Sequence, residues 1–189
     1  MLQHLAKVRL PTKLGEFTLH LFAFGGLEIP VLTQLEKVED FPVLRIHSSC
    51  MTGDVFHSLR CDCGAQLERA MQEIQARGGL LIYLPQEGRG IGLVNKLKAY
   101  ALQDQQSLDT VEANLQLGLP ADARDYTPAS AVLDFFKIRQ CIALTNNPLK
   151  IEALQAHGLY VKREALRVAA NPENESYLNT KLEKMGHFL

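Results

Sequence analysis

Two short apolar runs constrain the fold of this chain more than any other feature. GLLIYL (79–84) and CIALT (141–145) have no polar face, which is typical of strands buried on both sides of a sheet. Each run leads into a loop rich in glycine or asparagine and then into a segment with helical periodicity. The sequence therefore predicts a sheet whose faces are covered by helices.

The first fifty residues have a different pattern. Four runs have the composition of strands and are divided by proline or glycine: 5–10, 15–24, 29–35 and 42–49. Strands come first and then alternate with helices, so we expect one α+β domain over residues 1–189, with a mixed β-sheet and flanking helices. After a last strand near 159–166, residues 173–189 are expected to form a polar tail.

Helices are predicted from periodicity and from their start signals. Apolar positions recur at helical spacing from residue 64 to Gly78, and again from 93 to about 103. Three further helices are predicted from an N-cap residue followed by glutamate or proline at the expected position: Asp109 with Glu112, Thr127 with Pro128, and Asn147 with Pro148.

Composition excludes several classes of protein. The formal charge is −1 and there is no basic tract, which argues against a general nucleic-acid binder. No run approaches the roughly 18 apolar residues of a membrane span. The N-terminal stretch lacks the apolar core of a signal peptide, and four cysteines in 189 residues do not resemble a secreted disulfide scaffold. We therefore expect a cytoplasmic protein.

The stretch from Arg45 to Gln66 holds three of the cysteines, Cys50, Cys61 and Cys63. In a reducing compartment, clustered thiols hold metal more often than they form disulfides. If Cys61 and Cys63 lie on extended backbone, their side chains point the same way, and Cys50 reaches them if the intervening residues fold back. Three thiolates with no obvious fourth ligand describe one zinc ion with an open position, as in catalytic sites.

Such a zinc ion lowers the pKa of bound water and delivers hydroxide to an electrophilic carbon. The alternative is a structural site that His47, three residues before Cys50, closes as the fourth ligand. Cys141 lies inside an apolar run and is expected to be a buried core thiol.

Three loops carry charged residues that could serve a ligand. QEGRGIG (86–92) is glycine-rich and opens a helix, so its N–H groups and Arg89 could receive phosphate, although such turns are often only tight connections. TNNPLK (145–150) places Lys150 in the first turn of a helix, where a surface lysine is the simpler interpretation. DARD (122–125) has an aspartate and an arginine two residues apart. Such a pair is usually a solvated turn, and the motif alone assigns it no function.

Together, these motifs resemble the GTP cyclohydrolase II family over nearly the whole chain. The shared stretches, in chain order, are RIHSSCMTGDVFHSLRCDCGAQL, QEGRGIGL, NKLKAYALQD, DTVEAN, DARDY, LTNNPLK and TKLEKMGH. The resemblance implies a homodimer that uses zinc and magnesium in the first step of riboflavin biosynthesis. It implies conversion of GTP to 2,5-diamino-6-ribosylamino-4(3H)-pyrimidinone 5′-phosphate, with release of formate and pyrophosphate.

The resemblance also implies roles for individual residues. Cys50, Cys61 and Cys63 match the ligands of the zinc that hydrates C8 of the guanine ring and then hydrolyses the formamide. The implied GTP-binding positions are Arg45, Ile46, His47, Ser48, Ser49, Gln66, Glu87, Gly88, Arg89, Thr110, Thr145 and Lys150.

Three further residues match positions close to the reaction. Asp122 matches the proton acceptor, and Arg124 matches a proposed nucleophile toward the α-phosphorus. Because a guanidinium stays protonated, we favour Arg124 as a stabiliser of phosphate charge, with Asp122 as base or orienter. Tyr100 is expected to reach the base or the opened ring, with an interfacial core tyrosine as the alternative.

Four positions depart from the usual family pattern, namely Ser49, Pro85, Ala123 and Leu149, where glutamate, arginine, glutamate and lysine are usual. Two alternatives to full turnover stay open. One is an enzyme that leaves the formyl group attached or uses another purine nucleotide, and the other is a non-catalytic nucleotide-binding paralogue. A nucleobase deaminase is not expected, because its H-x-E and P-C-x-x-C signature is absent. The chain is also too short to include a fused dihydroxybutanone-phosphate synthase domain.

Overall fold

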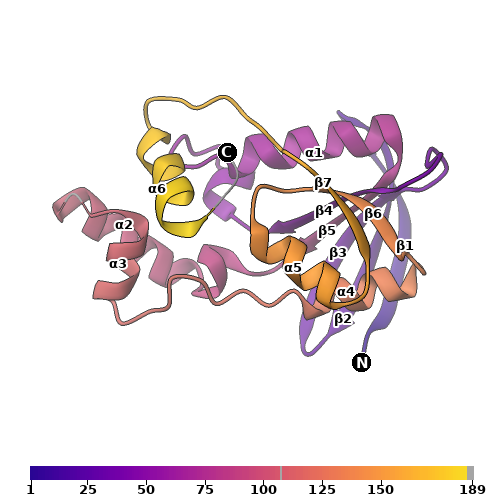
Figure 1. The fold of residues 1–189 in the computed structure, drawn as a ribbon, viewed down its shortest axis with the longest axis horizontal. Coiled ribbons are helices and arrows are strands. Elements are labelled where there is room, and N and C mark those ends of the chain that lie inside the picture. Colours follow the sequence, from indigo (N-terminus) through magenta and orange to yellow (C-terminus); the bar gives the residue numbers. More distant parts are fainter. Residues whose placement is uncertain (107, 187–189) are drawn as a thin grey trace.

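A computed structural model describes residues 1–106 and 108–186 of the chain. Within these residues, seven strands form one mixed sheet in the order β1-β2-β3-β5-β4-β6-β7 (Figure 1). The strands are β1 (Gln3–Thr12), β2 (Gly15–Phe24), β3 (Leu27–Gln34), β4 (Val43–Ser48), β5 (Gly79–Leu84), β6 (Gln140–Leu144) and β7 (Tyr160–Glu164). The predicted α+β class, with a mixed sheet and flanking helices, is confirmed.

One half of the sheet is antiparallel and the other half is parallel. Strands β1, β2 and β3 form a meander, and β3 pairs antiparallel with β5. Strands β5, β4, β6 and β7 are parallel to one another. From β4 the chain passes to β5 on one side and later returns to β6 on the other side. The carboxyl ends of β4, β5 and β6 therefore meet where the strand order reverses, which is where open sheets bind ligands.

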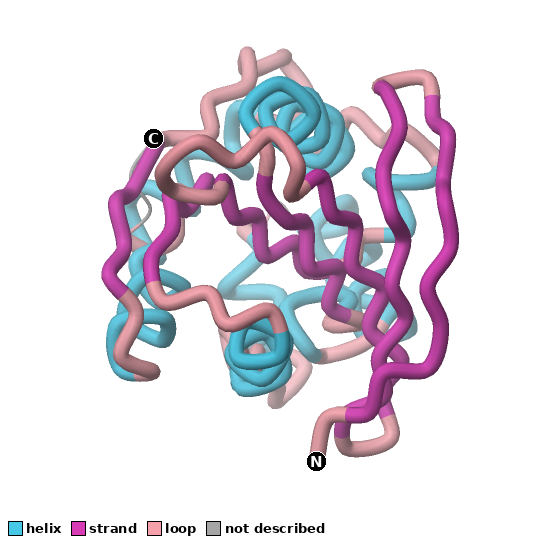
Figure 2. The backbone as a smooth tube through the Cα atoms, turned by 90° about the vertical axis from the view of Figure 1, so that its right-hand side faces the viewer, coloured by secondary structure: helices cyan, strands magenta, loops and turns pink. Residues whose placement is uncertain are grey.

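Helices cover both faces of the parallel half, as Figure 2 shows. Helix α1 (Cys63–Arg77) packs Ala70 and Ile74 against a core cluster that includes Leu81. Helices α4 (Thr127–Phe135) and α5 (Pro148–Ala156) contribute to a second cluster, which includes Leu80 and Ile82. Consecutive residues of β5 thus serve opposite faces, which explains why its sequence has no polar side.

The helix start signals behave largely as predicted. Asp109 accepts hydrogen bonds from the backbone of α3 (Thr110–Gln116), and Glu112 completes the capping box. Asn147 caps α5. Helix α4 begins at Thr127 with Tyr126 as N-cap, so the expectation of Thr127 as N-cap was wrong by one residue. Among the described helices, none is both long and apolar enough to cross a membrane.

The predicted polar tail, 173–189, contains helix α6 (Glu175–Met185), and its residues 187–189 lie outside the described part of the chain. Lys184 forms ion pairs with Asp109 and with Glu112, the latter at 2.9 Å. These contacts attach α6 to the start of α3 (Figure 1). The polar side chains of this segment therefore make tertiary contacts at one end of the sheet.

Candidate active site

A pocket lies at the carboxyl ends of β4, β5 and β6. Its wall includes the loops that follow these strands, together with residues of α2 (Leu93–Gln106), α3 and α6. Of the positions that family resemblance implies for nucleotide binding, all except Ile46 line this pocket. The side chain of Ile46 packs in the core instead, and its carbonyl oxygen accepts a hydrogen bond of 2.8 Å from Lys150 Nζ.

The three clustered thiols come together at one end of the pocket. The sulfur atoms of Cys50, Cys61 and Cys63 all lie within 4.8 Å of one another. The condition of extended backbone is not met, because Cys61 is in a bend and Cys63 is the first residue of α1. They converge because Gly53, in the helical turn η1 (Met51–Val55), lets the chain pass close to them. A Cβ atom at Gly53 would lie 2.9 Å from Cys61 Sγ.

These sulfur atoms suit zinc in chemistry and in spacing, because three mutually close thiolates form a soft donor set. Lys96 Nζ lies 3.0 Å from Cys50 Sγ and 2.8 Å from Glu87 Oε1. Hydrogen bonds from the other two thiols, and then from Lys96, lower the pKa of Cys50 below its ordinary value. These contacts favour ionisation of Cys50 over the other two thiols.

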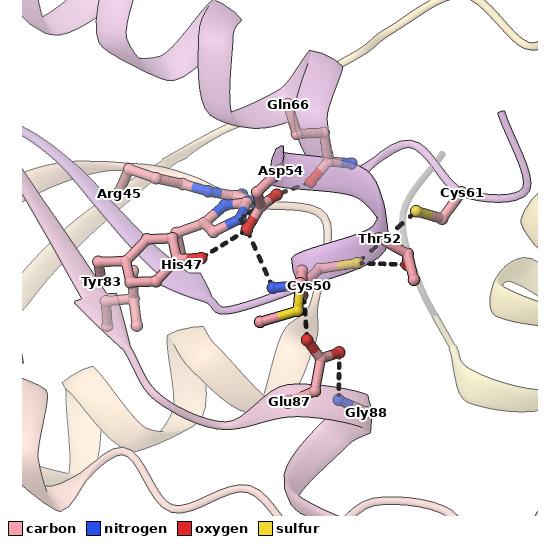
Figure 3. Close-up of polar contacts among 12 residues, drawn as sticks. Arg45, His47, Cys50, Thr52, Asp54, Cys61, Gln66, Tyr83, Glu87 and Gly88 are labelled. Carbon is pink, nitrogen blue, oxygen red and sulfur yellow. Dashed lines mark hydrogen bonds and ion pairs between the residues drawn. The ribbon is translucent and has the colours of Figure 1, made fainter. Parts of the chain in front are cut away.

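A buried hydrogen-bond network supports the first thiol (Figure 3). Arg45 lies 3.3 Å from Nδ1 of His47, and Nε2 of His47 lies 3.1 Å from both carboxylate oxygens of Asp54. Asp54 also accepts from the backbone N–H of Cys50 at 2.9 Å and from the Tyr83 hydroxyl at 2.8 Å. Because Arg45 can only donate to Nδ1, the proton of His47 is on Nε2. Both ring nitrogens are engaged, so His47 is not available as the fourth metal ligand.

The turn after β5 presents a buried cation. Gly88 and Arg89 lie in the left-handed region of backbone space, with φ of 63° and 62°. Glu87 holds this turn by accepting hydrogen bonds from the backbone of Gly88 and Met51, at 2.9 and 2.6 Å. Both terminal nitrogens of Arg89 are buried and have no hydrogen-bond partner among the described residues. Since a buried donor is rarely left unpaired, these nitrogens point to a ligand with acceptor oxygens.

Asp122 and Arg124 form a largely buried fork rather than a solvated turn, with side chains 16% and 9% exposed. Arg124 Nε donates to the two oxygens of Asp122 at 2.8 and 3.1 Å, and its NH2 group donates to the same carboxylate. Burial alone would raise the pKa of Asp122, but the hydrogen bonds from Arg124 lower it overall. Arg124 lines the pocket, and the pKa of its guanidinium is raised: burial opposes this, and the pairing with Asp122 outweighs it. Asp122 therefore orients a permanently charged guanidinium.

Further cations form the floor of the pocket. Arg45 donates to the Leu144 carbonyl at 3.0 Å and to Gln66 Oε1 at 2.8 Å, and burial lowers its pKa to about 10. Lys150 is buried, and desolvation followed by the charges of Arg45 and Arg124 lowers its pKa well below the ordinary value. Positive charge gathered away from water makes this floor suited to an anionic ligand.

The remaining predicted residues are also placed at the pocket. The ring of Tyr100 lies 4.3 Å from the guanidinium of Arg60, and burial raises its pKa to about 12. Tyr100 lines the cavity, as do Thr110 and Thr145. Tyr100 is thus a wall residue that contacts cations rather than a tyrosine of the hydrophobic core.

The four departures from the family pattern take different positions. Ser49 lines the pocket beside Cys50, and its backbone donates to the Leu84 carbonyl at 2.8 Å. Ala123 acts through its backbone, which donates to the Arg89 carbonyl at 2.9 Å. The side chains of Pro85 and Leu149 are exposed. Of the four, only Ser49 changes a side chain that lines the pocket.

Several pocket residues were missed by sequence reasoning. Lys96, Tyr177 and Lys181 line the pocket. Asp54 and Asp62 lie outside the lining and hold Cys50 and Lys181 in place. Lys96 could have been found, because it lies four residues before Tyr100 and so shares a helix face with it. The pairing of Lys181 with Asp62 left no local signal, because the two residues are 119 positions apart in the sequence.

The amino-acid sequence is similar to those of known proteins. A family model described as GTP cyclohydrolase II matches residues 3–165. The GTP cyclohydrolase-2 of Neisseria gonorrhoeae is 52% identical, over 100% of this chain and 98% of that protein. The GTP cyclohydrolase-2 of Acinetobacter baumannii is 50% identical, over 98% of this chain and 96% of that protein.

Longer proteins share the same region. The riboflavin biosynthesis protein RibBA of Staphylococcus saprophyticus is 47% identical over 97% of this chain, which covers 47% of that protein. A solved structure of RibBX, a two-domain 3,4-dihydroxy-2-butanone 4-phosphate synthase from A. baumannii, is 16% identical. The match covers 86% of this chain and 40% of the chain in that structure. Its TM-score of 0.47 is too low to establish a common fold.

Proposed function

Because the chain belongs to the GTP cyclohydrolase II family of enzymes, we propose that it opens the imidazole ring of GTP in the first step of riboflavin biosynthesis. The reaction releases formate and pyrophosphate and leaves 2,5-diamino-6-ribosylamino-4(3H)-pyrimidinone 5′-phosphate. One observation carries the proposal. Three thiols lie within 4.8 Å of one another in the pocket where the two buried terminal nitrogens of Arg89 have no partner in the described part of the chain.

Cys50, Cys61 and Cys63 would hold one zinc ion per chain, since their spacing and donor type fit it. When bound, zinc would acidify water and so supply the nucleophile for ring opening and for formamide hydrolysis. Lys96 offsets the charge of the thiolate at Cys50, and Asp54 holds the Cys50 backbone.

The cations of the pocket bind and orient the triphosphate. Arg89 offers a fork without a partner among the described residues, which can bind two phosphate oxygens, and Lys150 lines the same pocket as a further donor. Mg²⁺ accompanies the phosphates as part of the substrate complex. Arg124, held by Asp122, stabilises the charge that develops at the α-phosphate. A raised pKa of the guanidinium supports this electrostatic role over nucleophilic attack. Tyr100 contacts the base or the opened ring.

The homodimer and the cytoplasmic location belong to the same proposal. Family resemblance supports the homodimer, and the cysteine usage and the N-terminal stretch support the location. The GTP-binding role of the remaining pocket residues is proposed on the same basis. Their side chains line the cavity that holds the thiols.

The test is incubation of metal-analysed protein with GTP and Mg²⁺, with formate, pyrophosphate and the pyrimidine product followed together. Cys61→Ala should abolish formate release and reduce the bound zinc. Cys141→Ala is the matched control, because Cys141 is a buried thiol in the core on β6. This control variant should keep both formate release and bound zinc at the level of the parent protein.

Formate release by Cys61→Ala at the rate of the parent protein would show that the zinc assignment is wrong. Pyrophosphate without formate would favour an enzyme that stops at the formamide. Binding of GTP without any product would favour a non-catalytic paralogue.

A further inference from the structure

Helix α6 forms part of the pocket wall, although the matched family model ends at residue 165. It carries most of the TKLEKMGH stretch, for which family resemblance implies no role. Tyr177 and Lys181 are four residues apart and therefore share one face of the helix. Both line the pocket.

Lys181 is buried and is tied to the loop that carries the thiols. Its Nζ atom lies 2.5 Å from Oδ1 of Asp62, the residue between Cys61 and Cys63. The other oxygen of Asp62 accepts a hydrogen bond of 2.6 Å from Gln66. Asp62 is itself buried, so it holds the ammonium group of Lys181 in a defined position at the pocket wall.

A purely structural role explains this arrangement poorly. A buried ion pair is seldom more stabilising than apolar packing of similar volume. Attachment of α6 is already provided by Lys184, whose ion pairs to Asp109 and Glu112 lie on a more exposed side of the helix. An ammonium group also has three donors, and Asp62 occupies one of them.

Lys181 and Arg89 flank the same aromatic ring. Lys181 Nζ lies 4.4 Å from the centre of the Tyr177 ring, and the Arg89 guanidinium carbon lies 5.8 Å from it. The terminal nitrogens of Arg89 are buried without a partner among the described residues. Two cations around one ring, with donors to spare, form a site for an anionic group with several oxygens.

We propose that α6 closes the nucleotide pocket and that Lys181, together with Arg89, binds the phosphates of the substrate. Asp62 is a positioning residue that aims Lys181 into the pocket, and the Tyr177 ring contacts both cations. The inference rests on the proposed function, since it assigns the phosphate subsite of the same nucleotide. It makes the end of the chain part of the substrate site.

The test compares the same substitution at two lysines of one helix. Binding of the non-hydrolysable analogue α,β-methylene-GTP to zinc-loaded enzyme with Mg²⁺ is measured by calorimetry for the parent protein, Lys181→Gln and Lys184→Gln. Lys181→Gln should weaken binding about tenfold, the effect of one charge-assisted hydrogen bond. Lys184→Gln should stay within about twofold, because its contacts lie outside the pocket lining.

Guanosine separates phosphate contact from a general loss of the pocket, because it has no phosphate. It should bind the parent protein and Lys181→Gln equally, and Lys181→Arg should restore much of the affinity for the analogue. If Lys181→Gln does not fold because Asp62 is left unpaired, the double variant with Asp62→Asn removes both charges and is compared with Asp62→Asn alone.

Equal weakening by Lys181→Gln and Lys184→Gln would overturn the inference in favour of simple attachment of the helix. An equal loss for guanosine and the analogue would overturn the phosphate contact. Failure of the parent protein to bind the analogue at all would instead count against the proposed function.

Discussion

Replacing Asp54 by asparagine keeps the size of a buried side chain and removes its charge. The carboxylate accepts hydrogen bonds from Cys50 N at 2.9 Å, Tyr83 Oη at 2.8 Å and His47 Nε2 at 3.1 Å (Figure 3). Asparagine has one acceptor oxygen, so at least one of these donors must face an NH₂ group. An unsatisfied buried polar group costs about 1–3 kcal/mol. We therefore expect Asp54→Asn to lower the free energy of unfolding by about 2–4 kcal/mol.

Urea unfolding followed by circular dichroism measures this loss. The matched control is Asp134→Asn, because Asp134 pairs with Arg139 and His157 at the surface with 44% of its side chain exposed. Surface pairs contribute less than about 1 kcal/mol. A loss that is no greater for Asp54→Asn than for Asp134→Asn would refute the view that this carboxylate organises the buried network.

Zinc affinity gives an independent measurement of the same role. Because Asp54 holds the backbone of Cys50, we expect Asp54→Asn to weaken zinc binding about 10- to 100-fold in competition with a chromophoric chelator. An unchanged zinc affinity would show that the thiols are positioned without help from Asp54.

Two other perturbations have defined outcomes. A Cβ atom at Gly90 (φ +90°) would lie 2.8 Å from the Ala123 carbonyl, whereas one at Gly92 (φ +84°) would meet nothing within 4 Å. In urea unfolding, Gly90→Ala should therefore cost about 1–3 kcal/mol more than Gly92→Ala, and equal costs would contradict the predicted clash. Burial, and then the charges of His4 and Lys7, lower the pKa of His20 from an ordinary 6.5 to about 4. The unfolded chain therefore takes up this proton first, so stability contributed by neutral His20 is complete above about pH 6.5 and is lost as the pH falls toward about 4. His20→Phe should flatten the dependence of unfolding free energy on pH in that window, and an unchanged slope would contradict the assignment.

The elements that sequence predicted well are those encoded by near neighbours. The apolar runs of β5 and β6 mark strands covered on both faces, and the capping box at Asp109 marks the start of α3. Each signal is contained within a few consecutive residues, because backbone hydrogen bonding and burial of one face act at that range. The spacing of Cys50, Cys61 and Cys63 in the sequence likewise predicted that the three thiols form a cluster.

The contacts that only the tertiary structure decided join distant segments. Extended backbone would have aligned Cys61 and Cys63, but they lie at the start of α1, where Gly53 lets η1 approach. A polar composition suggested a tail after residue 173, but Lys181 in that segment meets Asp62, 119 residues earlier.

The surroundings of the charged loops were also decided by the fold. The DARD loop has the composition of a solvated turn, yet the side chains of Asp122 and Arg124 are largely buried and the backbone of Ala123 donates to the turn after β5. Burial of a charged pair depends on which segments pack over it, and no local pattern records that. The sequence by itself therefore determined most of the elements and the thiol cluster. The reversal of strand order at β4 decided which charges face one another across the pocket, because it brings the ends of β4, β5 and β6 to the same edge.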